Sequence, residues 1–546
     1  MTSGASLGDV QLLHSLLDDP LIDYRQLEDG SIVRATLPQL FVAMAVDAVR
    51  DFPQLRPHQR HPWHALLVQL AAIALHGAGR REVFTSVEDW RAALLALTPD
   101  DPDGAAWCLV APPYRPAFLQ APVPDGSLLS WKSIFRAADE LDMLVTSKNH
   151  DVKASRARGA DVQEWLFALM SLQTQEGFLG AGNYGISRMN GGFASRPGVG
   201  VAPSGYWGQR WKRDVEIVLG YRERIAEQRG LASSGGLALL WLIPWDGSNS
   251  VAFASLDPFY IELCRRVRLL VDGGQLLALG TGSRVARIAA KELNGVTGDA
   301  WTPIDTAAGK ALTIASEGFH YKLVSELLFG RRFVGGVAQS LEATPAEGRL
   351  QLVAQGVARG KGKTEGYHER RVPISRKLRR LLIEDRDRVA QAAFRRVTQI
   401  GDMRKLLWLS LATLFNNGMG SWDVSETIKE KATRFSQPFE RAEDARFFDD
   451  LTSEIEADDS NAERLRWQAG LVDRAEAVLR AAFDAGPRSA QRRYRARAAA
   501  LSRFRSALHG ENSPLPELTH HWRQRNEPSH RDLRHEEDEV EAAAFV

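Results

Sequence analysis

Residues 177–197 read GFLGAGNYGISRMNGGFASRP, a stretch with six glycines, two asparagines and two arginines but no carboxylate. Glycine lets a backbone approach a ligand closely and adopt positive φ, at an entropic cost that an idle loop does not need. The preceding residues 162–172, VQEWLFALMSL, have apolar side chains at helical spacing, which predicts a helix running into a loop. We call residues 177–197 the glycine loop and predict that it faces a ligand. A structural cluster of turns is the alternative.

The order of helix and loop argues against a nucleotide-binding motif. Glycine-rich phosphate loops follow a strand and open a helix. The glycine loop instead follows a predicted helix. It is therefore not predicted to hold phosphate as a P-loop does.

Length and composition describe a globular protein without a structural metal. With 546 residues and 44% apolar content, the chain can bury a large core, and two or more domains are expected. The longest apolar run, residues 65–75, is far shorter than the roughly 18 residues that span a bilayer, and no signal-peptide pattern opens the sequence. We expect a cytoplasmic protein that does not bind membranes. Two cysteines, Cys108 and Cys264, exclude a disulfide framework and a thiolate zinc site from this chain alone, and we expect no cofactor.

Basic residues cluster although the net charge is only +1. Residues 486–510 contain seven arginines and no carboxylate. These arginines can equally well form a solvated helix face or contact phosphates. Residues 355–380 carry nine cations against two carboxylates, Glu365 and Glu369. Those nine are Arg359, Lys361, Lys363, Arg370, Arg371, Arg376, Lys377, Arg379 and Arg380.

The first cluster has the pattern of a strand, a basic glycine turn and a second strand. An apolar run at residues 350–358 precedes RGKGKTEGYHERR, which predicts a hairpin with lysines at its tip. Tyr367 is expected to pack, and His368 is left open between packing and base stacking. We call residues 350–371 the basic hairpin. We expect its tip and the glycine loop to lie on the same side of the molecule.

A third polar segment, residues 146–159, reads TSKNHDVKASRARG. Its amide and imidazole groups suit base edges, and its cations suit phosphates. The neighbours His150 and Asp151 also raise the alternative of a metal-dependent nuclease, although adjacent residues in one loop do not specify a metal geometry. The segment's candidate contacts are Lys148, Asn149, His150, Lys153, Arg156 and Arg158.

Element patterns predict an α+β protein in which a large mixed α/β domain, residues 1–383, precedes a C-terminal helical bundle, residues 384–512. Strands are expected at residues 236–243, 269–279 and 350–357, and a helix at 64–75. Bundle helices are expected at 385–399, 402–415, 461–483 and 489–508, the third with a capping box of Ser460 and Glu463. Residues 513–546 form a polar tail that is expected to be poorly ordered.

Several short motifs in a fixed order resemble the large subunit (CasA family) of the type I-E CRISPR complex Cascade. The segment SLLDDPLIDYRQLEDGSIVRATLPQL resembles the family's first strand pair, and PAFLQ (residues 116–120) resembles a proline-containing motif. The glycine loop, FYIELCRRV (259–267), DAWTPID (299–305), HERR (368–371) and the helical C-terminus follow in the same order.

The resemblance implies a DNA-recognition subunit without catalysis. Such a subunit reads the protospacer-adjacent motif from the minor groove, wedges the duplex open so that guide RNA can invade, and helps recruit a helicase-nuclease; other Cascade subunits and guide RNA are its partners. A side-chain-poor loop suits the narrow minor groove, and base pairing reads the remaining sequence. The residues implied to contact DNA are Lys148, Asn149, His150, Lys153, Gly180, Gly182, Asn183, Arg188, Lys361, Lys363 and Thr364.

Two features depart from the family pattern. Some members carry a metal knuckle of cysteines after the ELC segment, whereas Cys264 is followed by RRVRLL, so no zinc is expected there. The hairpin tip is Lys-Gly-Lys-Thr, where known members present Gln and Asn, which leaves the motif that is read open. His58, His61 and His64 are not expected to bind metal together, because Pro57 and Pro62 interrupt the set.

Overall fold

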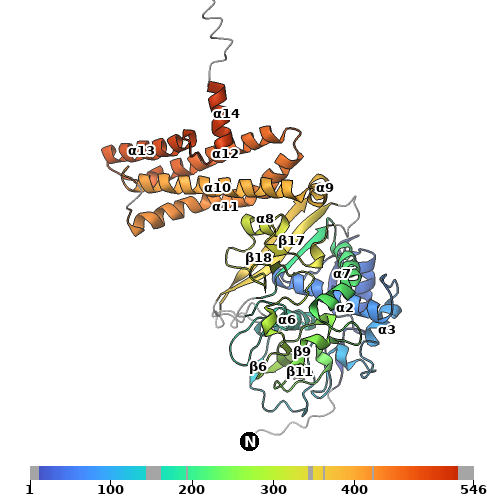
Figure 1. The fold of residues 1–546 in the computed structure, drawn as a ribbon. Helices are drawn as coiled ribbons and strands as arrows, with labels where there is room; N and C mark the ends of the chain where they lie inside the picture. The colour runs from blue at the N-terminus through green and yellow to red at the C-terminus, as the bar shows by residue number, and fades with distance from the viewer. Residues whose placement is uncertain are drawn as a thin grey trace, which may run out of the picture. The chain divides into compact units, whose positions relative to one another are not determined.

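The computed structural model describes residues 11–142, 161–191, 195–341, 349–360, 363–420 and 424–526. The chain divides into two compact units, Met1–Phe319 with Gly330–Arg376, and His320–Phe329 with Lys377–Val546 (Figure 1). The first unit mixes helices with small sheets, and the second is helical, so the predicted α+β class is confirmed. None of the helices in the described ranges is long and apolar enough to cross a membrane.

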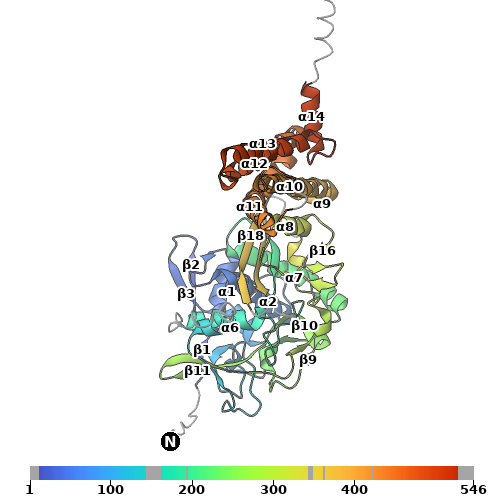
Figure 2. The same cartoon turned by 90° about the vertical axis from the view of Figure 1, so that its left-hand side faces the viewer.

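The core of the first unit surrounds one buried helix, α2 (Arg60–Gly77). Every residue from 61 to 75 is buried, as expected of a helix that is packed on all sides. The helices α6 (Val162–Gln175) and α7 (Trp207–Arg229) pack against α2, and both views show them side by side (Figures 1 and 2). Trp63 of α2 meets Phe167 of α6 edge to face at 5.1 Å between ring centroids. The remaining helices of this unit are α1 (Leu37–Ala45), α3 (Val87–Leu95) and α4 (Ala138–Leu141).

Among the described residues, seven small sheets surround this core. The most extended strands are β17 (Leu350–Gly360) and β18 (Lys363–Ile374), which form a sheet in the order β18-β17-β7 with β7 (Gly198–Pro203). The other sheets are β1 (Leu13–Ser15) with β5 (Cys108–Val110); β3 (Ile32–Ala35), β2 (Ile22–Gln26) and β4 (Val49–Asp51); β8 (Leu237–Leu239) with β10 (Leu256–Ile261); β9 (Val251–Ala252) with β13 (Ile288–Ala289); β6 (Ser133–Phe135), β12 (Gln275–Thr281) and β11 (Arg266–Asp272); and β15 (Lys310–Ala311), β14 (Ile304–Asp305) and β16 (Phe333–Val334).

Short 3₁₀ helices connect several of these strands. They are η1 (Pro57–Gln59), η2 (Ala105–Trp107), η3 (Leu240–Leu242), η4 (Phe253–Ser255), η5 (Lys291–Leu293) and η6 (Val337–Gln339). The strand predicted at 236–243 is therefore wrong in its second half, where η3 replaces it.

The second unit is a bundle in which α10 (Arg386–Phe415) packs against α11 (Glu426–Glu456), α12 (Ser460–Ala481) and α13 (Ala490–His509). The helix α8 (Tyr321–Leu328) belongs to this unit, and its Tyr321 ring lies 4.9 Å from that of Phe447. The other elements are α9 (Arg376–Glu384), η7 (Ala482–Ala485) and α14 (Pro516–Asn526). The helix α14 was not predicted and lies within residues 513–546, where Leu515 and Leu518 are buried.

Three predictions of the bundle helices were wrong. The segments 385–399 and 402–415 form the single helix α10, which runs through the partly buried Gly401 without a break. The helix α11 was missed, since it is rich in charge and contains Pro438. Asp459 rather than Ser460 caps α12, by accepting from the amides of Asn461 and Ala462 at 3.0 Å.

The strand predicted at 269–279 is a hairpin of two strands, β11 and β12. Asp272 pairs with Gln275, and the two residues between them are Gly273 and Gly274, with φ of 57° and 80°. Consecutive positive φ angles form the tight turn that matches strand twist. An apolar run on both sides of two glycines indicates a hairpin, and this signal was overlooked.

Buried histidines stabilise the first unit through separate partners. His64 lies 2.8 Å from Asp214, and His58 lies 2.7 Å from Asp142. His61 is buried against the Trp301 ring, with 5.7 Å between centroids. The part of the chain that the structure describes contains no group of three or more His, Cys, Asp or Glu side chains that could hold a metal ion.

The buried His64 makes stability depend on pH. Burial, with a smaller effect from the Arg210 charge, lowers the pKa of His64 to about 4. The unfolded chain binds this proton near pH 6.5, so stability is full above that pH and falls as the pH drops toward 4, by about 3 kcal/mol for this group. We expect urea midpoints, followed by tryptophan fluorescence, to fall between pH 8 and pH 5. His64→Gln should flatten this dependence, and an unchanged pH dependence in that variant would contradict the assignment.

Candidate nucleic-acid interface

The glycine loop begins where α6 ends. Asp161 caps the start of α6 by accepting from the amide of Gln163 at 2.9 Å, and the predicted helix continues to Gln175. At its end, the Gln173 side-chain amide donates to the carbonyls of Leu119 and Arg265, both at 3.0 Å. Its oxygen accepts from the amides of Cys264 and Arg265. The base of the loop is therefore fixed to the core.

The exposed tip of the loop is a closed turn of four residues. The amide of Leu179 donates to the carbonyl of Asn183 at 2.9 Å, and the amide of Asn183 donates back to Gly180 at 3.0 Å. Gly180 and Gly182 have φ of 119° and 86°, which side-chain-bearing residues rarely adopt. A side chain at Gly180 would meet open space. The turn therefore presents backbone and the exposed Ala181 and Asn183 to solvent.

The rest of the loop is held by its neighbours. Arg265 donates to the carbonyl of Gly177 at 2.7 Å and to that of Tyr184. The Tyr184 hydroxyl donates to the carbonyl of Arg284 at 2.8 Å, and the amide of Ser283 donates to Gly182 at 2.9 Å. The spacing of Gly180, Gly182 and Gly185 fits G-x-G-x-x-G, but a helix precedes it rather than a strand. The loop is a supported turn and not a phosphate cradle.

The structure places Arg188 in a buried position, whereas a contact with DNA was predicted for it. Its side chain is 3% exposed, its guanidinium lies 3.7 Å from the centre of the Tyr260 ring, and it donates to the Tyr260 carbonyl at 2.6 Å. The Glu262 carboxylate, 3.9 Å away, provides the opposite charge. We therefore assign Arg188 a structural role beneath the loop instead of the predicted DNA contact.

The basic hairpin is confirmed as β17 and β18, paired from Leu350↔Ile374 to Gly360↔Lys363 with an irregularity at Ala358 and Arg359. Thr364 pairs with Arg359. Lys361 lies outside the described residues, and only the backbone of Lys363 and Thr364 is described.

Tyr367 and His368 of the hairpin both pack within the first unit. Tyr367 is confirmed as a packing residue, because its hydroxyl donates to Glu369 at 2.7 Å and accepts from Gln355 at 3.0 Å. The His368 ring packs on Gly318, where an added Cβ would come within 2.3 Å of the ring. Neither aromatic ring is therefore a free stacking platform.

The glycine loop and the basic hairpin are joined at their bases. Glu176, which precedes the loop, forms an ion pair with Arg359 near the end of β17, and both side chains are at most 2% exposed. The Ser195 hydroxyl donates to the carbonyl of Val357 at 2.7 Å. The chain then enters β7, where Gly198 pairs with Gln355 of β17. The bases of the two elements are therefore adjacent, and Arg359 is a buried tether rather than an exposed cation.

The polar segment at residues 146–159 lies outside the described residues, and with it Lys148, Asn149, His150 and Lys153. Its flanks are fixed. The buried carboxylate of Asp142 lies 2.7 Å from His58 and accepts from Gln59 at 2.6 Å, and Asp161 caps α6. The segment therefore leaves and rejoins the same core that supports the glycine loop.

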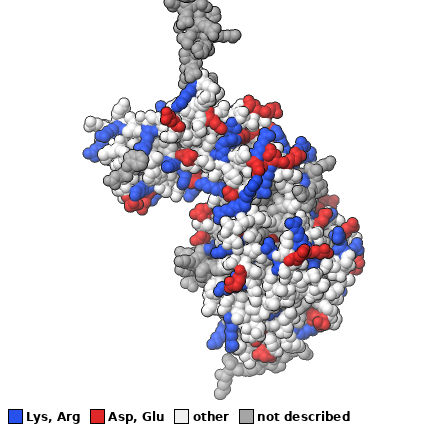
Figure 3. Space-filling view, in the orientation of Figure 1, with Lys and Arg blue, Asp and Glu red and all other residues white. Residues whose placement is uncertain are grey.

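Charges on the face seen in Figure 3 are mixed, with Lys and Arg beside Asp and Glu. Arginines of the basic clusters also have internal partners. Arg370 donates to the carbonyl of Phe319 at 3.2 Å, and Arg371 binds Glu369 at 2.7 Å. On α13, Arg497 pairs with Asp484 at 3.0 Å and Arg505 with Glu476 at 2.7 Å. Local cation counts therefore overstate the charge available to a polyanion.

Comparison with known proteins gives matches at the level of structure. No family model matches the chain, and neither does any curated protein sequence. The structure of Thermobifida fusca Cse1 matches with a TM-score of 0.63 and 14% identity, over 93% of this chain and 98% of that one. Thermus thermophilus CasA (Cse1) matches with a TM-score of 0.62 and 15% identity, over 91% and 99%. A chain of a CRISPR RNA-guided surveillance complex matches with a TM-score of 0.50 and 13% identity, over 91% and 99%.

These matches extend over nearly the whole of this chain and of each matched chain, so both units are included. At sequence identities of 14–15%, this structural similarity establishes the fold. The resemblance predicted from the short sequence motifs is confirmed at that level, and this chain has the CasA (Cse1) fold.

Proposed function

We propose that this chain is the large, non-catalytic subunit of a type I-E CRISPR surveillance complex. In this role it reads a protospacer-adjacent motif from the minor groove, opens the adjacent duplex and helps recruit a helicase-nuclease. The observation that carries the proposal is the joining of an exposed glycine turn to a basic hairpin through Glu176 and Arg359. The shared fold with CasA structures supports it.

The glycine turn suits minor-groove reading for a physical reason. The minor groove is narrow, and its hydrogen-bonding code is degenerate apart from the guanine amino group. A turn with open space at Gly180 can approach its floor, and the exposed side chain of Asn183 can add one hydrogen bond there. The supports from Arg265 and Ser283 hold the turn before DNA arrives, which lowers the entropic cost of binding.

The hairpin suits the opening of the duplex. Its β17 strand is hydrogen-bonded to β18 and, from Leu350 to Gln355, also to β7, so the base of the hairpin belongs to a three-stranded sheet. Exchange of a DNA duplex for a guide heteroduplex is nearly balanced in free energy, so a few phosphate contacts and one inserted tip can start it. Lys361, Lys363 and Thr364 are the proposed tip residues, and Lys148, Asn149, His150 and Lys153 the proposed contacts of the preceding segment.

The first prediction concerns the open space at Gly180. In the complex assembled with its other subunits and guide RNA, Gly180→Leu should weaken binding of a motif-containing duplex about tenfold or more, because the side chain blocks close approach. Electrophoretic mobility shift measures the dissociation constant. Gly309→Leu is the matched control, since Gly309 also has positive φ and no neighbour within 4 Å. Equal losses in the two variants would show that the effect is backbone strain.

The second prediction concerns the lysines of the hairpin tip. Each phosphate contact contributes about 0.9 to the slope of log affinity against log salt. Replacing both Lys361 and Lys363 by Ala should therefore reduce the magnitude of that slope by about 2. Replacing the exposed Lys291 and Lys310 by Ala removes the same charge elsewhere on the first unit. A slope that changes equally in both double variants would refute a specific role for the hairpin tip.

A further inference from the structure

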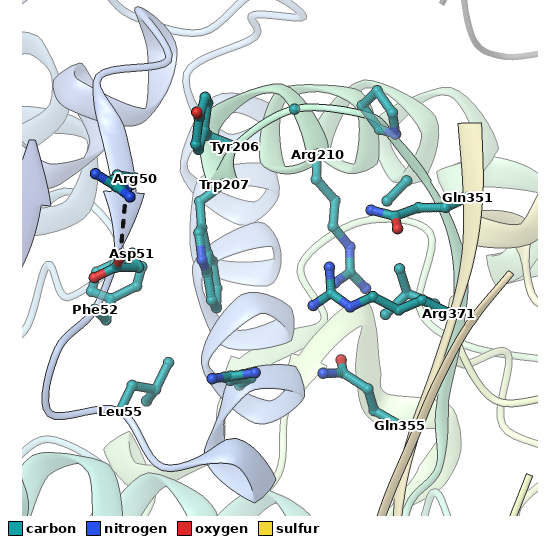
Figure 4. A pocket seen from close by; sticks show the side chains of 15 residues that line it. Arg50, Asp51, Phe52, Leu55, Tyr206, Trp207, Arg210, Gln351, Gln355 and Arg371 are labelled. Atoms are coloured by element: carbon teal, nitrogen blue, oxygen red, sulfur yellow. Dashed lines mark ion pairs between the residues drawn. The ribbon is translucent and has the colours of Figure 1, made fainter. Parts of the chain in front are cut away.

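A pocket of about 280 Å³ opens on the first unit, and no residue of the glycine loop lines it (Figure 4). Four parts of the chain form it: the end of β4 with the residues up to the start of α2, the end of β7, the first turn of α7, and the strands β17 and β18. Its volume is near the lower end of the roughly 300–1,000 Å³ that small-molecule sites occupy. A pocket of this volume can hold one small molecule or one monomer of a polymeric ligand.

The pocket is strongly cationic. Arg50, Arg60, Arg210 and Arg371 line it, against the single carboxylate of Asp51. Glu369 lies behind this lining and binds Arg371 at 2.7 Å and Arg60 at 3.7 Å. Asp51 is shared between Arg25 at 3.2 Å and Arg50 at 4.0 Å. The carboxylates nearby are thus outnumbered and already paired.

Arg210 is the least satisfied of these cations. Its side chain is 14% exposed, and its Nε and one terminal nitrogen are buried without a hydrogen bond in the described part of the chain. The nearest carboxylate, Asp214, is 4.0 Å away and is already bound by His64 at 2.8 Å and Arg213 at 2.7 Å. Burial and the neighbouring Arg371 and Arg213 charges lower the pKa of Arg210. A buried guanidinium whose nitrogens lack hydrogen bonds costs free energy that a bound anion would offset.

Two further features favour an anion with an attached ring. Trp207, Phe52 and Leu55 supply an apolar wall, and the exposed Tyr206 stands beside Trp207 (Figure 4). On the opposite side, Gln351 and Gln355 offer amide groups, and the Gln355 side-chain oxygen has no hydrogen bond within the described residues.

We propose that this arginine pocket binds one nucleotide of a single-stranded nucleic acid, with its phosphate on Arg210 and Arg371 and its base against Trp207 or Tyr206. In Figure 4 the two guanidinium groups point into the same part of the pocket, on the side away from the aromatic wall. Guanidinium groups bind phosphate with two hydrogen bonds, and bases stack on aromatic rings without regard to sequence. This site goes beyond the duplex reading proposed above and does not use the glycine turn.

The test uses the full chain and a fluorescein-labelled oligodeoxythymidine of about eight nucleotides, followed by fluorescence anisotropy. We expect binding, competition by TMP, and much weaker competition by inorganic phosphate. Arg210→Gln and Arg371→Gln should each weaken binding about 10- to 100-fold. Arg224→Gln is the matched control, because Arg224 is exposed on the same helix α7 and does not line the pocket.

Three outcomes would overturn the proposal. Equal competition by phosphate and TMP would indicate an anion site without base recognition, and tighter binding of a poly-glutamate peptide would indicate an acidic protein partner. An equal loss in Arg224→Gln would indicate non-specific attraction. If Arg210→Gln fails to give the thermal melt of the unaltered chain, the exposed Arg371 carries the test by itself. Loss of duplex binding in Gly180→Leu with pocket binding retained would separate this site from the proposed groove reader.

Discussion

A buried ion pair between Glu176 and Arg359 is the constraint on which the candidate interface depends. Both side chains are almost wholly removed from water. Replacing either partner by a neutral residue would therefore leave the other as an uncompensated buried charge. Burial lowers the pKa of Arg359 to about 10, so the guanidinium still carries its proton at neutral pH. The pair fixes the start of the glycine loop to the far end of β17, while Ser195 fixes the other end of the loop to Val357.

The glycine loop is therefore rich in glycine but held in position. Its tip has the positive φ angles and empty surroundings of a contact surface, and its base is held by Gln173 and Arg265. Preorganisation of this kind lowers the entropic cost of ordering the chain on binding. The chain continues from the loop into β7, which pairs with β17, so the loop and the hairpin share one sheet.

The sequence predicted what depends on local pattern and missed what depends on distant partners. The glycine loop, the helix before it and the basic hairpin were predicted because glycine content and apolar spacing are local signals. Arg188 and Arg359 belong to the same segments, but their burial depends on Glu262 and Glu176, which lie elsewhere in the chain. The arginine pocket collects side chains from segments near residues 50, 60, 210 and 371, and no single segment carries its signal. The division of α10 failed because one glycine in a helix is tolerated when packing is strong.

The central claim is that the loop and the hairpin act as one element through the Glu176–Arg359 pair. A double-mutant cycle with Glu176→Gln, Arg359→Gln and the double variant tests it most directly, with target-duplex affinity of the assembled complex and thermal melts as readouts. The account predicts that each single variant weakens duplex binding about tenfold or more, and that the double variant loses clearly less than the sum of the two. Single variants that fold and bind the duplex with unchanged affinity would contradict it.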